Sequence, residues 1–426
     1  MRSSTCRQLL SLIAKATVTT QPTCFERHRG VIPPAVALLS IMCLSSLGQH
    51  TGYEGLMSAM FTSLGGVLGW TDSPAASSFC RARQKVTEVM FEAFRVEVFR
   101  LAGPTLRTFQ PKVKGFRVVA VDGSWMSVPR SEPLRRLLGI HHIGPKRCPM
   151  GKPQVLLVVL TDAITRMPIA RVILPGTGSE REAACALLKH LDKGDILVAD
   201  RGYNGRDMLA AIHATGCSYV LRIPGGVGTW REFRGLQRRR CRDAKVAIVG
   251  LKKPLTVRHL RVSGGPGRPR RGSKRETMYL ITNLTKQWTA KTIATVYRTR
   301  WGIETMFREL KCTLETNRIR ARTLEGITQE LDARGLHLAI AAFLDMATVN
   351  DHQRPGQMPF SSRQTNRTTL LCLLAMALLA TDDDALLDRC AIAVSSAARR
   401  AQRKRPGRWT PRKPAMFVKN GKKRRT

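Results

Sequence analysis

The chain has 426 residues, enough for two or three domains of ordinary size. Hydrophobic residues make up 43% of it, which excludes a wholly disordered chain. Its 71 lysines and arginines exceed its 30 aspartates and glutamates by 41 charges, and such an excess repels itself unless a polyanion neutralises it. Nucleic acid is therefore the expected partner. An acidic membrane surface is the alternative, but binding there normally needs an amphipathic or lipidated anchor.

The N-terminal region, up to about residue 111, is predicted to be helical because its apolar residues recur at helical spacing. The expected helices are Ala35–Leu47, Tyr53–Leu64 and Pro74–Leu101. Ser73 offers an N-cap to the third helix, and Pro74 suits its first position. The same stretch contains a basic cluster of Arg81, Arg83 and Lys85, which is either a solvated helix face or a DNA contact.

Residues 115–224 alternate predicted strands and helices. The run GFRVVAVDGS predicts a strand that stops at Asp122, and two further strands around the polar loop Thr161–Pro168 predict a hairpin. Ser179 caps a helix, with Glu182 completing a capping box. A short buried strand ending at Asp200, a helix from about residue 205 and a last strand, CSYVLRI, follow.

The alternation ends in a basic segment, residues 224–288. Its arginines are concentrated in RRRCR (238–242) and RPRRGSKR (268–275), among strand-like pieces such as AKVAIVG and LTVRHLRV. This segment is interpreted as a β-rich insertion. Helices resume at Thr289 and continue through most of the chain to Gln402. The last 28 residues carry 13 lysines or arginines and no acid, which indicates a solvated tail that adds sequence-independent affinity for DNA.

Two aspartates stand at the ends of predicted strands, Asp122 in VVAVDGS and Asp200 in ILVADRGY. In sheets flanked by helices, side chains at the C-terminal ends of strands enter the crevice where ligands bind. If the two strands are neighbours, as the element order permits, the carboxylates repel each other unless a divalent cation lies between them. The alternative for each residue is an aspartate that forms a turn before glycine.

A third acid lies on the predicted helix TIATVYRTRWGIETMFRELKCTLE. Tyr297, Arg300, Glu304 and Lys311 fall on one stripe, about 60° wide if each residue turns the helix by ~100°. This polar stripe, flanked by Trp301, indicates a functional face. The alternative is a solvated ladder in which Arg300 pairs with Glu304 four residues later.

These motifs resemble the DDE transposases of bacterial insertion sequences, in the subgroup named for its YREK signature. The resemblance rests on VDGS at Asp122, on ADRGY at Asp200, and on the spacing Tyr297-x2-Arg300-x3-Glu304-x6-Lys311. It covers about residues 118–322. The segments RHRGVIPPAVALL and SSFCRARQKV extend it weakly into the N-terminal domain.

The resemblance implies an α/β fold. The expected core is a ribonuclease-H-like mixed sheet flanked by helices, with the β-rich insertion and with helical N-terminal and C-terminal regions. The expected domains are a DNA-binding domain (1–111), a catalytic domain (112–350, with the insertion at 224–288), a helical region (351–398) and the basic tail (399–426).

By the same resemblance, Asp122, Asp200 and Glu304 would be the catalytic acids, and they would hold two Mg²⁺ or Mn²⁺ ions for in-line phosphoryl transfer. A second set of residues would bind DNA. Tyr297, Arg300 and Lys311 would grip phosphates, Trp301 would stack on a displaced base, and Arg81, Arg83 and Lys85 would contact the terminal inverted repeats.

The expected activity is that of a DNA transposase, which binds transposon ends, cleaves them and joins their 3′-hydroxyls to target DNA. A homodimer on DNA is expected because both ends must be held together. The apolar stretches Leu336–Ala347 and Leu370–Leu387 serve either dimerisation or the intrachain core. Two alternatives stay open: a nuclease of the same fold without strand transfer, and a catalytically inactive DNA-binding derivative.

Other sequence motifs say less about function. The 11 cysteines are singletons, so no disulfide framework is expected, and His141, His142 and Cys148 lack the second half of a metal site. GRPRRGSK (267–274) has Lys and Ser in the wrong order for a phosphate-binding loop. Trp230 is a base-stacking wedge or, more simply, a core tryptophan.

Membrane insertion is not expected. The run Val31–Leu47 contains two prolines, and Thr369–Ala380 has 12 residues where a bilayer needs about 20. A cytoplasmic, nucleoid-associated protein is therefore predicted.

Overall fold

The computed structural model describes residues 7–8, 10–12, 16, 31–44, 52–110, 112–139, 153–251, 254–263, 277–314, 319–351 and 384–400. Its strands are β1 (Arg117–Ser127), β2 (Gln154–Asp162), β3 (Pro168–Pro175), β4 (Asp195–Ala199), β5 (Ser218–Ile223), β6 (Asp243–Ile248), β7 (Leu255–Ser263) and β8 (Thr277–Thr282). They form one eight-stranded sheet in the order β3-β2-β1-β4-β5-β8-β7-β6.

The sheet is mixed. Strand β1 runs parallel to β4, and β4 runs parallel to β5, whereas the other neighbouring pairs are antiparallel. The predicted hairpin is confirmed as β2 and β3. The predicted neighbourhood of the strands that carry Asp122 and Asp200 is confirmed by the β1–β4 pair.

Helices cover both faces of the sheet, so the expected α/β fold class is confirmed. One face lies under α7 (Glu180–Leu187), α8 (Arg206–Ala214) and α9 (Arg231–Arg238). The other lies under α10 (Ala290–Arg298), α11 (Trp301–Arg308) and α12 (Leu324–Asp351). Successive side chains of a strand point to opposite faces, so Val119 and Val121 enter the first core and Val118 and Ala120 enter the second.

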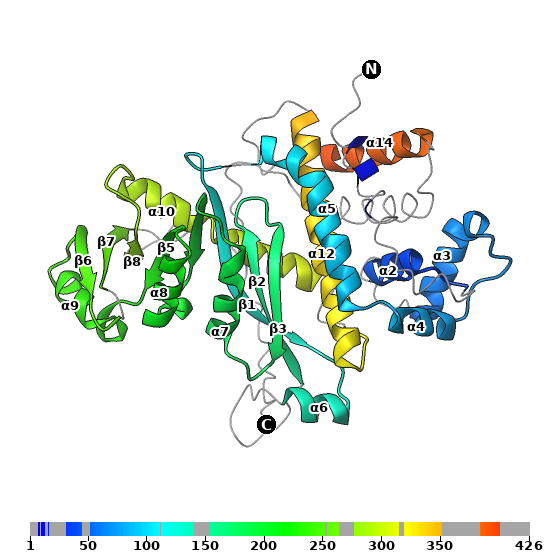
Figure 1. Cartoon of the computed structure of the whole chain (residues 1–426), viewed down its shortest axis with the longest axis horizontal. Helices are drawn as coiled ribbons and strands as arrows, with labels where there is room; N and C mark the ends of the chain where they lie inside the picture. Colours follow the sequence, from blue (N-terminus) through cyan, green and yellow to red (C-terminus); the bar gives the residue numbers. More distant parts are fainter. Residues whose placement is uncertain are drawn as a thin grey trace, which may run out of the picture.

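The predicted insertion does not form a sheet of its own. Its strand β8 pairs with β5, so β6, β7 and β8 extend the central sheet, and α9 packs on them as part of the lobe that Figure 1 shows at the left. The arginine-rich stretch 268–275, the loop 267–274, the histidines at 141–142 and Cys148 lie outside the described residues.

The N-terminal helices are α2 (Pro34–Cys43), α3 (Tyr53–Leu68), α4 (Ala76–Gln84) and α5 (Glu88–Phe109). The prediction of one helix over 74–101 is wrong, because it is two helices separated at residues 85–87. Thr87 starts α5 by accepting a hydrogen bond from the Met90 amide, while the Gln329 side chain of α12 donates to the carbonyls of Arg83 and Val86. The Ser73 cap is also wrong, since Ala75 occupies the N-cap position without a side-chain bond.

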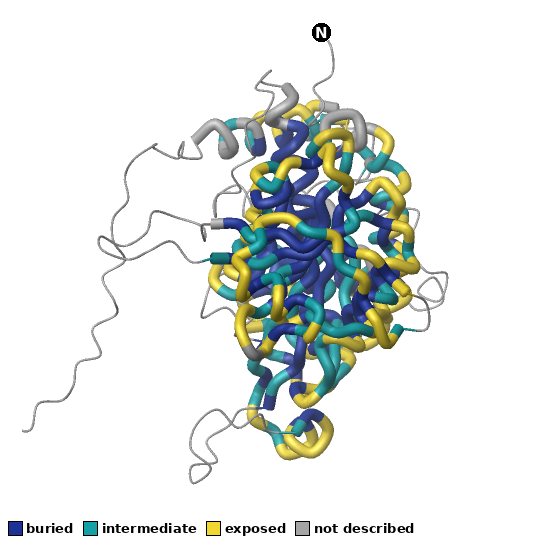
Figure 2. The backbone as a smooth tube through the Cα atoms, turned by 90° about the vertical axis from the view of Figure 1, so that its left-hand side faces the viewer, coloured by how far each residue is buried: buried dark blue, intermediate teal, exposed yellow. Residues whose placement is uncertain are grey.

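Helix α12 is the link between the N-terminal helices and the sheet. Figure 1 shows α5 and α12 side by side between the two parts, and Figure 2 shows the buried backbone concentrated at the centre. Along Leu336–Ala347 the side chains are buried against the N-terminal helices, so this stretch belongs to the intrachain core rather than to a dimer interface. Most of 370–387 lies outside the described residues; α14 (Asp384–Arg400) and the short α6 (Glu132–Leu138) complete the helices described.

No helix among the described residues is long and apolar enough to cross a membrane.

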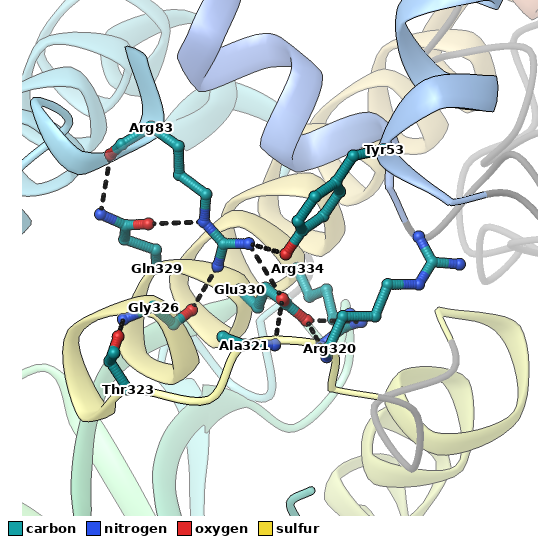
Figure 3. A network of polar contacts seen from close by, with 9 residues as sticks. All are labelled: Tyr53, Arg83, Arg320, Ala321, Thr323, Gly326, Gln329, Glu330 and Arg334. Atoms are coloured by element: carbon teal, nitrogen blue, oxygen red, sulfur yellow. Dashed lines mark hydrogen bonds and ion pairs between the residues drawn. The ribbon is translucent and has the colours of Figure 1, made fainter. Parts of the chain in front are cut away.

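Arg83 connects the N-terminal helices to α12 in a buried polar network (Figure 3). Its guanidinium donates to the Tyr53 hydroxyl at 2.6 Å, to the Gln329 side chain at 2.9 Å and to the Gly326 carbonyl at 2.6 Å. It also pairs with Glu330 at 3.2 Å, and both side chains are almost fully buried. Arg83 therefore has no group left for DNA, and its expected DNA contact is corrected to a structural role. Arg81 and Lys85 are exposed, and for them the DNA contact stays a prediction.

Replacing Arg83 by alanine is expected to lower the free energy of unfolding by about 3 kcal/mol, because it leaves the buried Glu330 carboxylate short of a partner. Urea unfolding measures this. The matched variant Arg81→Ala, exposed on the same helix, is expected to change stability by less than about 0.5 kcal/mol. Equal effects of the two variants would contradict the assigned role.

His259 of β7 lies in a stack of rings beneath α9. It is fully buried between Phe233 at 5.4 Å and Tyr279 at 5.8 Å, measured between ring centroids. Within the described residues, neither of its ring nitrogens has a hydrogen-bond partner. Burial lowers the pKa of His259 to about 4, because the charged imidazolium would lose its hydration.

The free energy of unfolding should therefore depend on pH through His259. Its pKa is lower in the folded than in the unfolded state, so the unfolded state binds the proton first and stability falls as pH drops from about 6.5 towards 4. His259→Phe keeps the ring stack and is expected to remove most of this loss. Urea unfolding at several pH values tests it, with the exposed His213→Gln as control. An unchanged acid limb in His259→Phe would show that another group causes the loss.

Candidate active site

Asp122 and Asp200 lie at the same level of two adjacent parallel strands. In the β1–β4 ladder Ala120 is opposite Val198, so two residues further each strand reaches an aspartate. The prediction that the first strand stops at Asp122 is wrong: β1 continues to Ser127 because its other edge still pairs with β2 there. Strand β4 does end, at Ala199. Beyond Ala120, therefore, β1 has no β4 partner on this edge.

Asp200 is held by the turn that follows its strand. Its carboxylate accepts a hydrogen bond from the Gly202 amide at 2.6 Å and caps the single helical turn Arg201–Tyr203. A Cβ at Gly202 would lie 2.9 Å from the Asp200 carboxylate, so glycine permits this close approach. The turn thereby fixes the position of the Asp200 carboxylate, and one of its oxygens is already hydrogen-bonded.

The pKa of Asp122 is raised by its burial and by the acids around it. Burial, followed by the negative charges of Asp200 and Glu180, raises the pKa of Asp122 to about 7. The nearby Arg300 guanidinium and the Gly123 amide, which donates to Asp122 at 3.0 Å, oppose this shift. A carboxyl group with a pKa of about 7 is partly protonated at neutral pH, and a cation that binds to it displaces the proton.

Arg300 brings the third acid to the first. One terminal nitrogen of its guanidinium donates to Glu304 Oε1 at 2.6 Å, and the other lies 3.8 Å from Asp122 Oδ2. Burial lowers the pKa of Arg300, but Tyr297 and then the carboxylates of Glu304 and Asp122 outweigh it and raise the pKa, so the guanidinium stays charged. The predicted Arg300–Glu304 ion pair thus exists as part of this cluster rather than as a solvated ladder.

The predicted single helix with one continuous polar stripe is wrong. Helix α10 ends at Arg298, α11 begins at Trp301, and Glu309–Thr313 is a π-helical segment. Because a π-helix turns less per residue than an α-helix, the angular position expected for Lys311 does not hold. Burial lowers the pKa of the half-buried Lys311.

The other residues of the predicted stripe differ in exposure. Tyr297 is buried, its ring lies 5.9 Å from the Arg300 guanidinium carbon, and its hydroxyl has no hydrogen-bond partner among the described residues. Trp301 is 46% exposed. Trp230 is half-buried against Phe233 and covered by the Arg206 guanidinium at 5.1 Å, which favours the interpretation as a packing residue.

Sequence reasoning missed Glu180, a fourth carboxylate at this site. It lies in the first turn of α7, accepts a hydrogen bond from the Tyr203 hydroxyl at 2.5 Å, and occupies the space where a Cβ on Gly123 would come within 2.6 Å of it. The neighbouring Arg181 donates to the Gly202 carbonyl at 2.7 Å. The N-terminus of α7 therefore holds the turn after Asp200. The only sequence signal was the Ser179 cap, which is confirmed by its bond from the Glu182 amide.

Gly302 sets the distance between α11 and the sheet. A Cβ at this position would lie 2.0 Å from the Ala163 carbonyl oxygen in the β2–β3 turn. Real Cβ atoms do not approach a backbone atom so closely, so a larger residue must push α11 outwards. Glu304 lies two residues further along the same helix, and its position beside Arg300 thus depends on Gly302.

Gly302→Ala is expected to lower the free energy of unfolding by about 2–3 kcal/mol or more, because a rigid backbone atom is in the way. Chemical denaturation measures the loss. Gly335→Ala in α12 is the control, since nothing lies within 4 Å of its Cβ. Alanine there should stabilise the helix by about 0.5–1 kcal/mol. A neutral Gly302→Ala would contradict the close approach.

The acids at this site have the chemistry of a hard-metal site. Carboxylate oxygens are the ligands that Mg²⁺ and Mn²⁺ prefer. The pKa of Asp122 is raised first by burial and then by the negative charges of Asp200 and Glu180, and a divalent cation would offset both causes. Among the described residues, no three carboxylate, imidazole or thiol groups already lie together at metal-ligating distances. The Arg300 guanidinium stands between Asp122 and Glu304 and supplies the positive charge there.

Comparisons with known proteins relate the chain to transposases. The family described as the transposase DDE domain matches residues 114–340, a range that contains all three acids. Transposase InsG for insertion sequence element IS4 of Escherichia coli (strain K12) is 24% identical over 305 residues, which are 67% of this chain and 65% of that protein. The chain thus spans about 65% of the length of this curated relative. A cryo-EM structure of the piggyBac transposase synaptic complex with hairpin DNA has a TM-score of 0.46 and 11% identity, covering 94% of this chain and 86% of that chain.

Proposed function

The chain belongs to the transposase DDE domain family, and from this premise we propose that it is a DNA transposase that cleaves the ends of its element and joins their 3′-hydroxyls to target DNA. Family membership implies a DNA partner and a divalent metal in general; Mg²⁺ or Mn²⁺, the YREK subgroup and a homodimer that holds both ends are parts of the proposal. The observation that supports it best is the convergence of Asp122, Asp200 and Glu304, which are separated by 78 and 104 residues in the chain, at the C-terminal end of β4.

In this proposal Asp122, Asp200 and Glu304 hold the metal. When bound, divalent cations activate the attacking oxygen and stabilise the leaving oxygen of an in-line phosphoryl transfer. The parts of the chain keep the acids ready for this. The parallel β1–β4 pair aligns the two aspartates, the Gly202 amide orients Asp200, and Gly302 lets α11 bring Glu304 close.

Arg300 takes two roles in turn. Before metal and DNA arrive, its guanidinium neutralises Asp122 and Glu304, which would otherwise repel each other. Once a metal neutralises the two acids, the terminal nitrogens of the guanidinium would be the donors for a phosphate oxygen of the DNA. The exposed indole of Trp301, next in the chain, is free to stack on an unpaired base.

Asp122→Asn, Asp200→Asn and Glu304→Gln are each expected to abolish metal-dependent nicking of DNA that carries the element ends. Each keeps the size of the side chain and removes the charge that holds the cation. Electrophoresis of a supercoiled plasmid measures nicking, and gel shift measures DNA binding, which should persist. The control is Glu132→Gln, an exposed acid of α6 that pairs with surface arginines.

Full cleavage by any of the three variants would refute the assignment of that acid. A second arm separates the transposase from a nuclease of the same fold: pre-cut ends are supplied with a target plasmid, and only a transposase joins them. If wild-type protein nicks but never joins, the nuclease is correct. If it binds the ends and does neither with Mg²⁺ or Mn²⁺, the chain is an inactive derivative.

A further inference from the structure

A strongly basic surface lies on the insertion, away from the carboxylates. We call it the α9 basic face. It consists of exposed side chains from α9 and from the turn after it: Arg231, Arg238, Arg239, Arg240 and Arg242. In the part of the chain that the structure describes, none of these five arginines forms an ion pair with a carboxylate.

The two acids between residues 231 and 248 are committed elsewhere. Glu232 accepts hydrogen bonds at 2.9 and 3.0 Å from Arg206, which comes from α8. Asp243 accepts two from the nearly buried Arg258 of β7, at 2.8 and 2.6 Å. Both acids are therefore already paired with arginines that do not belong to the basic face. The five arginines of the face are left uncompensated, and their mutual repulsion raises the free energy of the protein alone.

The backbone beneath the basic face is anchored to its surroundings. Phe233 of α9 is fully buried in the aromatic stack, and the Gln237 side chain donates to the Pro224 carbonyl at 3.2 Å and accepts from the Gly226 amide at 3.0 Å. Arg240 has a φ of 54°, in the left-handed region that favours glycine. The turn thus carries a long cationic side chain at a backbone position where glycine would be less strained. These contacts hold the inner side of α9 and leave its arginines on the outer side.

We propose that the α9 basic face binds the phosphate backbone of duplex DNA without reading its sequence. All five cations are arginines, whose planar guanidinium groups match phosphate oxygens in paired hydrogen bonds. Duplex DNA presents such phosphates as a rigid row, whereas an anionic membrane would need apolar anchors beside the charges. The inference rests on the proposed transposase function, whose substrate is DNA.

The surface is separate from the proposed catalytic acids. Strand β6 is four places from β4 in the sheet, which at about 4.8 Å per strand is roughly 19 Å, and α9 covers the sheet face opposite α11. A contact there holds a part of the duplex away from the cleaved bond. Changing it should alter DNA affinity without disturbing Asp122, Asp200 or Glu304.

The test is the salt dependence of binding by the full chain. Fluorescence anisotropy with a labelled 30-base-pair duplex of arbitrary sequence gives the binding constant at several KCl concentrations. The variant is Arg231→Gln/Arg238→Gln/Arg242→Gln. The expected result is a slope of log K against log salt that is smaller by about 3, because each lost phosphate contact contributes about 0.9.

The matched control removes the same charge from elsewhere: Arg100→Gln/Arg135→Gln/Arg136→Gln. These exposed arginines already pair with Glu97 or Glu132, so the slope should stay near that of the wild type. Circular dichroism confirms that both variants fold. Equal slopes for the two triple variants would overturn the proposal, since net charge alone would then explain binding. Loss of binding to phosphatidylserine vesicles with unchanged DNA slope would overturn it in favour of a membrane.

Nicking by the wild-type protein distinguishes a failure of the α9 basic face from a failure of the proposed transposase activity. If wild-type protein nicks element ends while the α9 variant keeps its full salt slope, the basic face is refuted and the transposase stands. If the slope falls as expected but wild-type protein does not nick with Mg²⁺ or Mn²⁺, the surface stands as a DNA-binding face and the proposed catalysis is refuted.

Discussion

The ion pairs of the Arg300 guanidinium with Asp122 and Glu304 are the interaction on which the site depends. Two partly buried carboxylates from a strand and a helix repel each other when both are ionised, and a cation between them relieves this repulsion. Arg300 provides that charge from a position between α10 and α11, where its two terminal nitrogens reach both acids. The helix segment is shaped accordingly: α10 ends before Arg300, and Gly302 allows α11 to touch the β2–β3 turn.

A second constraint is the parallel pairing of β1 with β4. It sets Asp122 and Asp200 at one level, and β4 ends at Ala199, so no residue of β4 pairs with β1 beyond Ala120. Glu180 and Arg181 at the N-terminus of α7 then fix the turn after Asp200, through the Tyr203 hydroxyl and the Gly202 carbonyl. Burial and then the nearby charges of Asp200 and Glu180 raise the pKa of Asp122.

Cationic side chains in this protein do two different jobs, which charge counts do not distinguish. Arg83 and Arg258 are buried and pair with acids of other elements, so they join parts of the fold. The α9 basic face is exposed and forms no ion pair among the described residues, and the nearest acids in the chain, Glu232 and Asp243, are bound by Arg206 and Arg258. The net charge of +41 therefore does not show where on the surface positive charge is available to a partner.

Several features followed from local sequence because short-range physics decides them. The β-branched runs predicted the strands, the Thr161–Pro168 loop predicted the hairpin, and Ser179 and Thr289 marked helix starts that the structure confirms. The spacing of Tyr297, Arg300 and Glu304 also pointed to the right segment. What local patterns could not show was the break between α4 and α5, the role of Arg83, and Glu180. Each depends on a partner far away in the chain, such as Gln329, Glu330 or Tyr203, and only packing of the whole sheet and helices brings these groups into contact.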